Sequence, residues 1–188
     1  PDWEPTLEST REPEKKLARK EAELSLADCI TCPSEFVLRS IPASIRVKKQ
    51  CQVATFGSPS GTTHLEKSSE RGSQGNLKLL FVGSMSQRKG LADLFEAMNQ
   101  LKTQTITLSV LGQPSMPMSF YRDRYSQFEY IAPCTNEQVR RVMGKHDVLV
   151  LPSIVEGRAL VQQEALSCGL PLIVTPNAGG DDLIEKEK

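Results

Sequence analysis

Residues 147–176, DVLVLPSIVEGRALVQQEALSCGLPLIVTP, constrain the fold of this chain more than any other stretch. They begin with an apolar, β-branched run at 148–151, pass through a turn containing proline and glycine, and continue as a helix-like segment over about 159–168. Gly169 ends that segment, and a second apolar run follows at 170–174. This order predicts a strand, a loop, a helix and a second strand, which together form the unit of a parallel sheet.

Similar apolar runs precede this unit. The β-rich runs are 77–83, 106–112, 128–132, 147–153 and 170–176. Between the first two, apolar residues recur at helical spacing over 91–101, and between the third and fourth Thr135 and Gln138 form a capping box ahead of a helix. Strands that alternate with helices predict an α/β domain with a Rossmann-like, doubly wound parallel sheet.

The chain before residue 77 has a weaker pattern. Residues 1–12 show little periodicity, and Trp3 stands alone among them. The elements predicted after them are helices over 14–28 and 35–40, the second with Ser34 as N-cap, and strands at 29–32 and 51–56. Residues 57–76 are polar and rich in glycine and serine, which is typical of a linker. We therefore predict a domain boundary there, with 77–188 as the second domain and a further helix beginning at Asp181.

The charged residues are balanced, with 23 Lys plus Arg and 23 Asp plus Glu. This balance argues against a surface that binds nucleic acid or an anionic membrane. No apolar run approaches the roughly 20 residues needed to span a bilayer, and no signal-peptide pattern follows Pro1. We therefore expect a cytoplasmic protein without a nucleic-acid partner.

The cysteines and histidines offer little chemistry. Cys29 and Cys32 form a C-x-x-C that could be a redox pair or half of a zinc site, but no second such pair exists and the only histidines are His64 and His146. We therefore expect buried thiols and no metal. His146, at the end of a predicted helix, is better explained as a partner of the helix dipole than as a catalytic group.

Arg88 and Lys89 form the first candidate site. They follow the strand at 77–83 and stand just before Gly90, where a helix begins. Cationic side chains beside the free amides of a helix start suit a diphosphate, because the charges and the helix dipole act in the same sense. The alternative is a solvated basic pair without a ligand. The position of the pair at the carboxyl end of a strand argues against that alternative.

Two carboxylates, Glu156 and Glu164, flank the start of the next helix. Its first amides, at 159–161, are expected to be unpaired and to bind an anion. Glu164 would lie about 7 Å further along the helix axis and could accept hydrogen bonds from vicinal hydroxyls. Alternatively, Glu164 is only an exposed helix residue and Glu156 only an acidic residue of a loop. Gly179 and Gly180 could form a second amide nest, although a simple turn is favoured.

Two blocks, FVGSMSQRKGLADLFEA and DVLVLPSIVEGRALVQQEALSCGLPLIVTPNAGG, resemble glycosyltransferase family 4, enzymes of the GT-B fold, in their nucleotide-sugar-binding C-terminal domain. The segment ELSLADCITCPSEFVLRS more faintly resembles the end of the N-terminal domain. The resemblance implies that 1–56 are a remnant of the N-terminal domain, 57–76 a linker and 77–188 the donor domain, truncated at its C-terminus. Such enzymes are about twice as long, so we expect an excised fragment.

The resemblance also implies roles for single residues. Lys89 matches the lysine on the donor diphosphate, Glu164 the carboxylate on the ribose hydroxyls, and Glu156 the carboxylate beside the sugar. The remaining donor-site matches are Gly83, Ser84, Ile131, Pro133, Gly157, Ala159, Leu160 and Val161, of which Ile131 and Pro133 occupy the region that lines the base and the last three provide loop amides.

Two departures from the family pattern matter. The arginine that often follows the first strand's glycine is Ser84 here, so Arg88 is expected to serve in its place as a catalytic cation with Lys89. The common Phe-Gly after the first glutamate and its glycine is Arg158-Ala159, which restricts the backbone and would add a charge near the phosphates.

The implied activity is a hexosyltransferase-type transfer from UDP- or another nucleotide-activated sugar to an acceptor hydroxyl, with retention and without a metal or other cofactor. The acceptor could be a saccharide, a lipid-linked molecule or a small molecule, and peripheral membrane association of the full-length protein stays open. We expect the fragment itself to be inactive. Alternatives are a non-catalytic Rossmann-like binding or scaffold domain and a sugar-nucleotide epimerase of the same fold. A missing G-x-G-x-x-G disfavours an NAD-dependent oxidoreductase.

Overall fold

The computed structural model describes residues 2–57, 75–101, 103 and 105–183. Its main body is a five-stranded parallel sheet in the order β5-β4-β3-β6-β7. The strands are β3 Leu77–Val82, β4 Ile106–Leu111, β5 Phe128–Ile131, β6 Val148–Leu151 and β7 Leu172–Val174. They match the five predicted runs, and the order reverses between β3 and β6. The predicted α/β doubly wound, Rossmann-like fold class is therefore confirmed.

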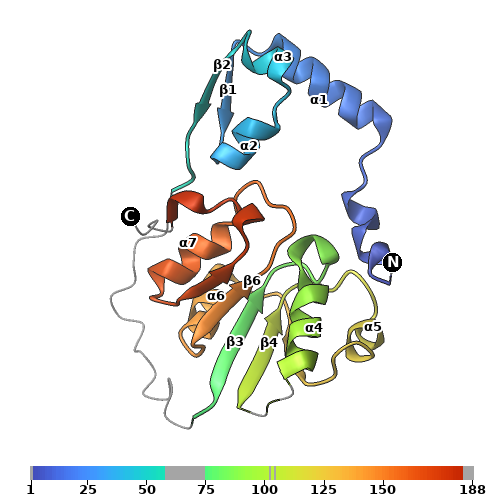
Figure 1. The fold of residues 1–188 in the computed structure, drawn as a ribbon, viewed down its shortest axis with the longest axis vertical. Helices are drawn as coiled ribbons and strands as arrows, with labels where there is room; N and C mark the ends of the chain where they lie inside the picture. Colours follow the sequence, from blue (N-terminus) through green and yellow to red (C-terminus); the bar gives the residue numbers. More distant parts are fainter. Residues whose placement is uncertain (1, 58–74, 102, 104, 184–188) are drawn as a thin grey trace.

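Helices cover both faces of this sheet (Figure 1). On one face lie α4 (Leu91–Leu101) and α5 (Met118–Arg122), which pack with β3, β4 and β5 around Phe81, Phe95 and Tyr121. On the other lie α6 (Asn136–Met143) and α7 (Leu160–Ser167), which pack on alternate strand residues such as Leu80 and Leu149. The side chains of a strand alternate between faces, so one chain supplies both cores.

Local sequence signals place these helices accurately. The helix α4 occupies the predicted residues, and its buried side chains are Leu91, Leu94, Phe95 and Met98. The predicted capping box is present at the start of α6, where the Thr135 side chain accepts from the Gln138 amide and the Gln138 side chain accepts from the Thr135 amide. The helix α7 begins at Leu160, one residue later than predicted. The start of α6 is thus set within its own first turn, whereas Ala159 at the N-cap of α7 makes no side-chain capping bond.

Residues before the predicted linker form a second, smaller unit. It consists of α1 (Glu14–Leu26), β1 (Cys29–Cys32), α2 (Glu35–Ser40), α3 (Ala43–Arg46) and β2 (Gln50–Val53), with β1 and β2 paired in parallel. The Ser34 hydroxyl accepts from the Val37 amide, as its predicted capping role requires. The short α3 was not predicted, and β2 begins one residue earlier and ends earlier than the predicted strand.

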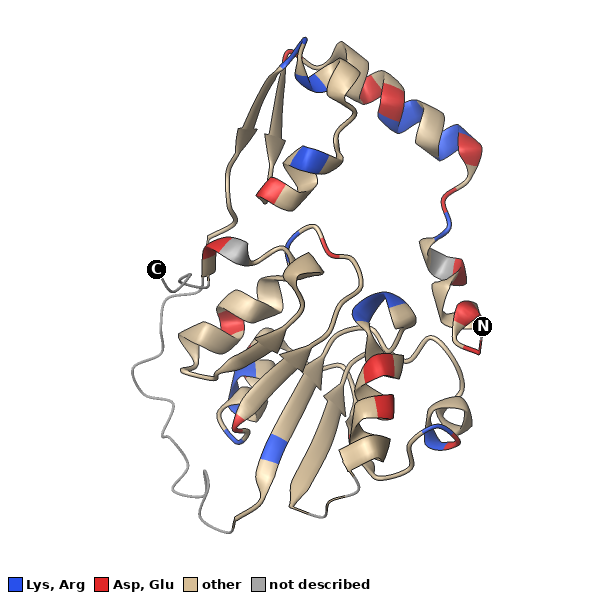
Figure 2. Cartoon of the chain, viewed as in Figure 1, with Lys and Arg blue, Asp and Glu red and all other residues tan. Residues whose placement is uncertain are grey.

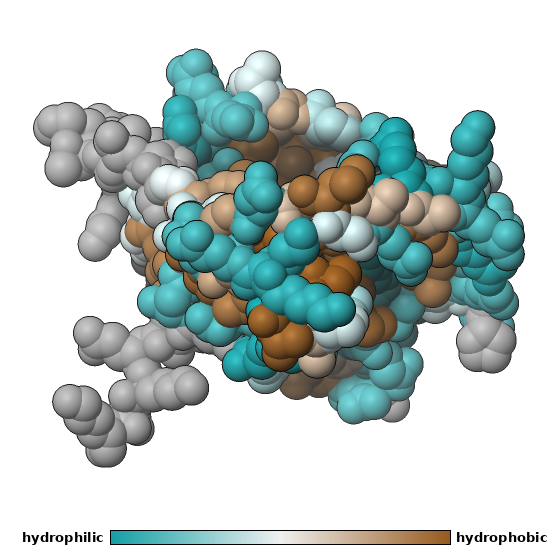
Figure 3. All heavy atoms as spheres, turned by 90° about the horizontal axis from the view of Figure 1, so that it is seen from above, coloured by the Kyte–Doolittle hydropathy of each residue, from teal (hydrophilic) through white to brown (hydrophobic). Residues whose placement is uncertain are grey.

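Seen from above (Figure 3), the surface mixes hydrophilic and hydrophobic side chains.

Short 3₁₀-helices complete the fold. They are η1 (Glu4–Thr10), η2 (Gln87–Lys89), η3 (Pro176–Ala178) and η4 (Asp181–Leu183). The helix predicted from Asp181 is 3₁₀ over its first three residues, and its remainder lies outside the described residues. Most of the predicted linker at 57–76 also lies outside them, so the domain division stays a prediction. No helix in the described part of the chain is long and apolar enough to cross a membrane.

Candidate functional site

The carboxyl ends of β3 and β6 meet through η2 and the loop that follows β6. Gly90, which ends η2, has φ +72°, and a Cβ atom added to it would lie 1.9 Å from the Pro152 carbonyl oxygen. Only glycine allows this approach, because it has no Cβ and adopts the left-handed region without strain. The Ile154 amide then donates to the Arg88 carbonyl at 3.0 Å. This contact fixes the loop after β6 directly against η2.

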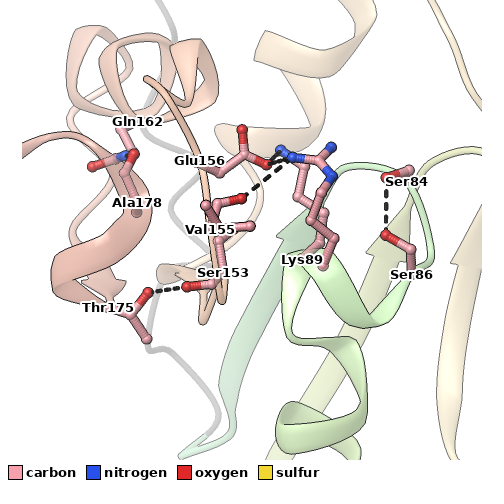
Figure 4. A network of polar contacts seen from close by, with 10 residues as sticks. Ser84, Ser86, Lys89, Ser153, Val155, Glu156, Gln162, Thr175 and Ala178 are labelled. Atoms are coloured by element: carbon pink, nitrogen blue, oxygen red, sulfur yellow. Dashed lines mark hydrogen bonds and ion pairs between the residues drawn. The ribbon is translucent and has the colours of Figure 1, made fainter. Parts of the chain in front are cut away.

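Arg88, Lys89 and Glu156 form one ion-pair cluster at this junction. Figure 4 shows Lys89 and Glu156 side by side. The Glu156 Oε1 atom lies 2.5 Å from Arg88 Nη1 and 2.6 Å from Lys89 Nζ. The Lys89 and Glu156 side chains are only 13% and 11% exposed, so water screens their attraction less than at an open surface. Two cations against one carboxylate leave one positive charge, which makes the cluster attractive to a further anion. Figure 2 shows the basic residues of η2 beside this loop.

The Lys89 stem connects the cluster to the end of β3. A Cβ atom at Gly83 would lie 3.4 Å from Lys89 Cε, so the lysine side chain runs along Gly83. Gly83 donates its amide to Leu111, and Gly112 donates its amide to Ile131, which links the ends of β3, β4 and β5. Ile131 is half-buried and Pro133 is exposed. The edge of the sheet is therefore continuous from Lys89 towards Ile131.

Within the described residues, the start of α7 supplies two unpaired amides rather than the three predicted. Ala159, which was expected to have a free amide, donates it to the Ala178 carbonyl at 3.2 Å. The loop after β7 folds back here, and the Glu156 amide likewise donates to Asn177. Among the described residues, no group accepts from the amides of Leu160 and Val161. These two donors and the positive end of the helix remain suited to an anion.

Glu164 lies one turn further along α7 and is half-buried. Its carboxylate has no hydrogen-bond or ion-pair partner within the described part of the chain. Because Glu164 is half-buried and the neighbouring Gln162 and Gln163 are 0% and 4% exposed, it is not the exposed helix residue among polar neighbours of the alternative interpretation. Gln162 Nε2 donates to the Ala178 carbonyl at 2.7 Å and holds the loop after β7 against α7.

Arg158 does not add a free charge near the cluster, contrary to the expectation from its sequence position. Its side chain is 1% exposed, and its two terminal nitrogens lie 2.6 and 3.0 Å from the carboxylate oxygens of Asp182. This bidentate pair lowers the pKa of Asp182, chiefly through the hydrogen bond from Arg158. The positive charge is thus compensated within the fold, and Arg88 and Lys89 are the cations left near the helix start.

A family model described as "Glycosyl transferases group 1" matches residues 76–188, which is more than half of the chain. The chain belongs to this family. The predicted resemblance to a glycosyltransferase is confirmed at that level.

Among curated relatives of this group 1 glycosyltransferase chain, the amylovoran biosynthesis glycosyltransferase AmsK of Erwinia amylovora is 25% identical over 122 residues, covering 58% of this chain and 30% of AmsK. An uncharacterized glycosyltransferase of Methanocaldococcus jannaschii is 26% identical over 116 residues, covering 58% of this chain and 30% of that protein. The chain thus spans about a third of the length of the curated relatives it matches, 30% to 31%.

Solved structures share the fold at lower identity. Sucrose-phosphate synthase from Thermosynechococcus elongatus has a TM-score of 0.74 at 20% identity, covering 93% of this chain and 47% of that chain. Anabaena HepE, solved in complex with UDP and glucose, has a TM-score of 0.64 at 16% identity, covering 85% of this chain and 47% of that chain.

Two groups considered from the sequence play structural roles in the glycosyltransferase fold. His146 Nδ1 lies 2.8 Å from the Val142 carbonyl at the end of α6, and burial lowers the pKa of the imidazole. A neutral ring that donates to this carbonyl is favoured over an imidazolium. The five cysteines are free thiols. The expectation of buried thiols is confirmed for Cys32 but wrong for Cys29, which is exposed because alternate residues of β1 face opposite sides. No group of three or more metal-ligating side chains occurs in the described ranges.

Sequence reasoning missed the loop after β7 and the N-terminal segment. Asn177 and Ala178 hold the loop after β6 only through their carbonyl oxygens, which every residue possesses. The Thr175 hydroxyl donates to the Ser153 carbonyl at 2.5 Å and joins the same two loops (Figure 4). Ser84 and Ser86 lie with their hydroxyls 3.3 Å apart beside η2. Main-chain hydrogen bonds between loops leave no signal in the pattern of side chains along the sequence.

Proposed function

We propose that this chain is the donor-binding part of a family 4 glycosyltransferase that transfers a hexose from a nucleoside diphosphate sugar to an acceptor hydroxyl with retention. The observation that carries the proposal is the placement of Arg88 and Lys89 on one carboxylate, Glu156, at the edge of the sheet next to the unpaired amides of α7. A diphosphate carries the charge and the acceptor oxygens that these groups lack.

The diphosphate would bind between the two cations and the start of α7. Lys89 and Arg88 would turn part of their interaction from Glu156 to the phosphate oxygens, and the amides of Leu160 and Val161 would donate to the same group. When the glycosidic bond breaks, negative charge grows on the departing diphosphate. Cations and amides already fixed in place stabilise that charge without reorganisation, which is the largest electrostatic contribution available here.

The remaining groups suit the other parts of a donor. Glu164 lies about 6 Å along the axis from Leu160, a distance that fits the step from a phosphate to a ribose whose vicinal hydroxyls need acceptors. Glu156 would then be free to accept from hydroxyls of the sugar. Gly83, Ser84, Gly157, Ile131 and Pro133 would line the donor, the last two at the base. UDP is the favoured nucleotide, because Anabaena HepE was solved with UDP and glucose.

The proposal has four further parts. The cations supply the charge that a divalent metal would otherwise supply, so donor binding should not need one. The acceptor is a saccharide, a lipid-linked molecule or a small molecule, and it would meet the donor on the side of the smaller N-terminal unit. We place the protein in the cytoplasm, where nucleotide sugars are made, with peripheral membrane association open. The 188-residue chain, which spans about a third of the length of its curated relatives, should not transfer sugar by itself.

The first test is calorimetric titration with UDP, UMP, GDP and ADP, with and without EDTA. We expect a preference for one nucleoside diphosphate over its monophosphate, unchanged by EDTA. Lys89→Ala and Glu164→Ala should each weaken binding about tenfold, the value of one charge-assisted hydrogen bond. The matched controls are Lys145→Ala, an exposed lysine after α6, and Glu96→Ala on α4.

Equal effects of the site variants and the controls would contradict the proposal. So would binding of the monophosphate and diphosphate with equal affinity, because the second phosphate would then gain nothing from the cluster. Sugar transfer by the 188-residue chain would contradict the expectation that the fragment is inactive.

A further inference from the structure

Residues 2–10, the N-terminal segment, pack against the main sheet domain, whereas the helix α1 that follows them belongs to the smaller unit. Figure 1 shows the chain start beside α4 and α5, whereas α1 leads away to the smaller unit. Trp3 is the anchor, because its ring makes edge-on or tilted contacts with three aromatic rings. The ring centroids lie 5.9 Å from Phe95, 5.3 Å from Phe120 and 5.8 Å from Tyr121. Arg124 adds a hydrogen bond of 3.0 Å to the Asp2 carbonyl.

This anchor brings Thr6 to the first turn of η2. Thr6 is 1% exposed, and its hydroxyl donates to the Trp3 carbonyl at 2.7 Å. The same oxygen accepts from the Gln87 amide at 3.0 Å, across 81 positions of sequence. Gln87 is the first residue of η2, and the N-cap residue, Ser86, makes no side-chain capping bond. Thr6 therefore provides the N-cap that a local residue normally provides.

The capped helix is the one that carries Arg88 and Lys89. A helix of three residues has almost no stability of its own, since its ends leave most of its backbone groups without partners. Contacts from outside must therefore set its orientation. They include two hydrogen bonds to its main chain: the Ile154 amide donates to the Arg88 carbonyl, and the Thr6 hydroxyl accepts from the Gln87 amide. Both hold the main chain from which the two cationic side chains project.

We propose that Thr6 is a positioning residue for the donor diphosphate: by capping Gln87 it fixes η2 and so directs Arg88 and Lys89 at the phosphates. This inference rests on the proposed function. The Thr6 hydroxyl bonds to the Trp3 carbonyl and the Gln87 amide, so it acts through the main chain of η2. The segment at 2–10 is thus a functional part of the donor site, although it precedes the helix that opens the smaller unit.

The test compares three variants. Thr6→Val keeps the shape of the side chain and removes the hydroxyl, Thr6→Ser keeps the hydroxyl, and Thr10→Val removes an exposed hydroxyl of the same helix that bonds only locally, to the Leu7 carbonyl. For each, affinity for UDP and for inorganic pyrophosphate is measured by calorimetry. Hydrogen exchange of the amides at 87–90 is measured without ligand, with the amides of β3 as an internal reference.

We expect Thr6→Val to weaken binding of both ligands about fivefold, the worth of one neutral hydrogen bond. Exchange at 87–90 should accelerate by about the same factor, while β3 stays unchanged. Thr6→Ser should restore both properties, and Thr10→Val should match the wild type in both.

Wild-type affinity and exchange in Thr6→Val would overturn the inference. Faster exchange spread equally over η2 and β3 would also overturn it, because Thr6 would then serve general stability. If the wild type binds neither UDP nor pyrophosphate, the proposed function fails and the phosphate role of Thr6 fails with it. Faster exchange confined to 87–90 would in that case still support the cap itself.

Discussion

Replacement of Gly90 by alanine tests the junction that assembles the site. Its backbone has φ +72°, and an added Cβ would lie 1.9 Å from the Pro152 carbonyl oxygen. To reach the 3.4 Å of ordinary contact, η2 and the loop after β6 must separate by about 1.5 Å. Gly169 provides a matched control, because it has φ +65° and no atom lies within 4 Å of its added Cβ.

The two substitutions share the backbone strain and differ in the clash. Left-handed strain costs an L-residue about 1 kcal/mol, and forced overpacking adds about 2 kcal/mol. We therefore expect Gly169→Ala to lower the free energy of unfolding by about 1 kcal/mol and Gly90→Ala to lower it by about 3 kcal/mol. In a chain of this size these losses lower Tm by about 3 °C and about 9 °C.

Urea denaturation and thermal unfolding measure both losses, and UDP titration measures the effect on the site. Gly90→Ala should also weaken UDP binding, since the displaced η2 carries Arg88 and Lys89, whereas Gly169→Ala should leave it unchanged. Equal losses of stability in the two variants would refute the reasoning, because the close approach to Pro152 would then have no energetic consequence.

Three further predictions concern buried polar groups. Tyr121→Phe should lower the free energy of unfolding, measured by urea denaturation, by about 2 kcal/mol. The buried Tyr121 hydroxyl accepts from the amides of Ser115 and Met116 and donates to the Met85 carbonyl. The control is Tyr125→Phe at another buried tyrosine, which should lower the free energy of unfolding by less than half as much. Asp182→Asn should lower the free energy of unfolding by about 2 kcal/mol, because it leaves the 1%-exposed Arg158 side chain without its counter-charge. The control, Glu137→Gln in an exposed ion pair, should lower it by less than about 0.5 kcal/mol. Since the folded-state pKa of Asp182 lies below its ordinary 3.8, its pair stabilises the fold above about pH 4 and is lost as the pH falls through the lowered pKa. Glu156→Gln should tighten binding of inorganic pyrophosphate about fivefold in calorimetry, because Arg88 and Lys89 no longer share a carboxylate.

Each of these has a contradicting result. A loss for Tyr125→Phe as large as for Tyr121→Phe would mean that the hydroxyl network adds nothing. An acid unfolding profile unchanged in Asp182→Asn would contradict the linkage to its pKa. Pyrophosphate binding that weakens in Glu156→Gln would show that the carboxylate supports the cations rather than competing for them.

Local signals in the sequence were sufficient to predict the strands of the sheet and several of the helices that pack on it. The apolar spacing over 91–101 and the Thr135 capping box gave helices at the predicted residues, because periodicity and first-turn hydrogen bonds depend on neighbours within a few positions. The candidate residues Lys89, Arg88 and Glu156 could also be placed at one edge, since parallel strands end together. The roles predicted for Glu164, Ile131 and Pro133 in donor binding stay predictions.

The sequence by itself determined the alternation of strands and helices, and with it the fold and the edge where a ligand can bind. Only the tertiary structure decided which polar groups meet: Arg88 with Glu156 across 68 positions, Arg158 with Asp182, and the Gln87 amide with the Thr6 hydroxyl across 81 positions. It also decided that the Ala159 amide bonds to Ala178 instead of staying free. The physical reason is that these contacts depend on how finished elements pack, and the side chains and carbonyls that make them carry no periodic signal along the chain.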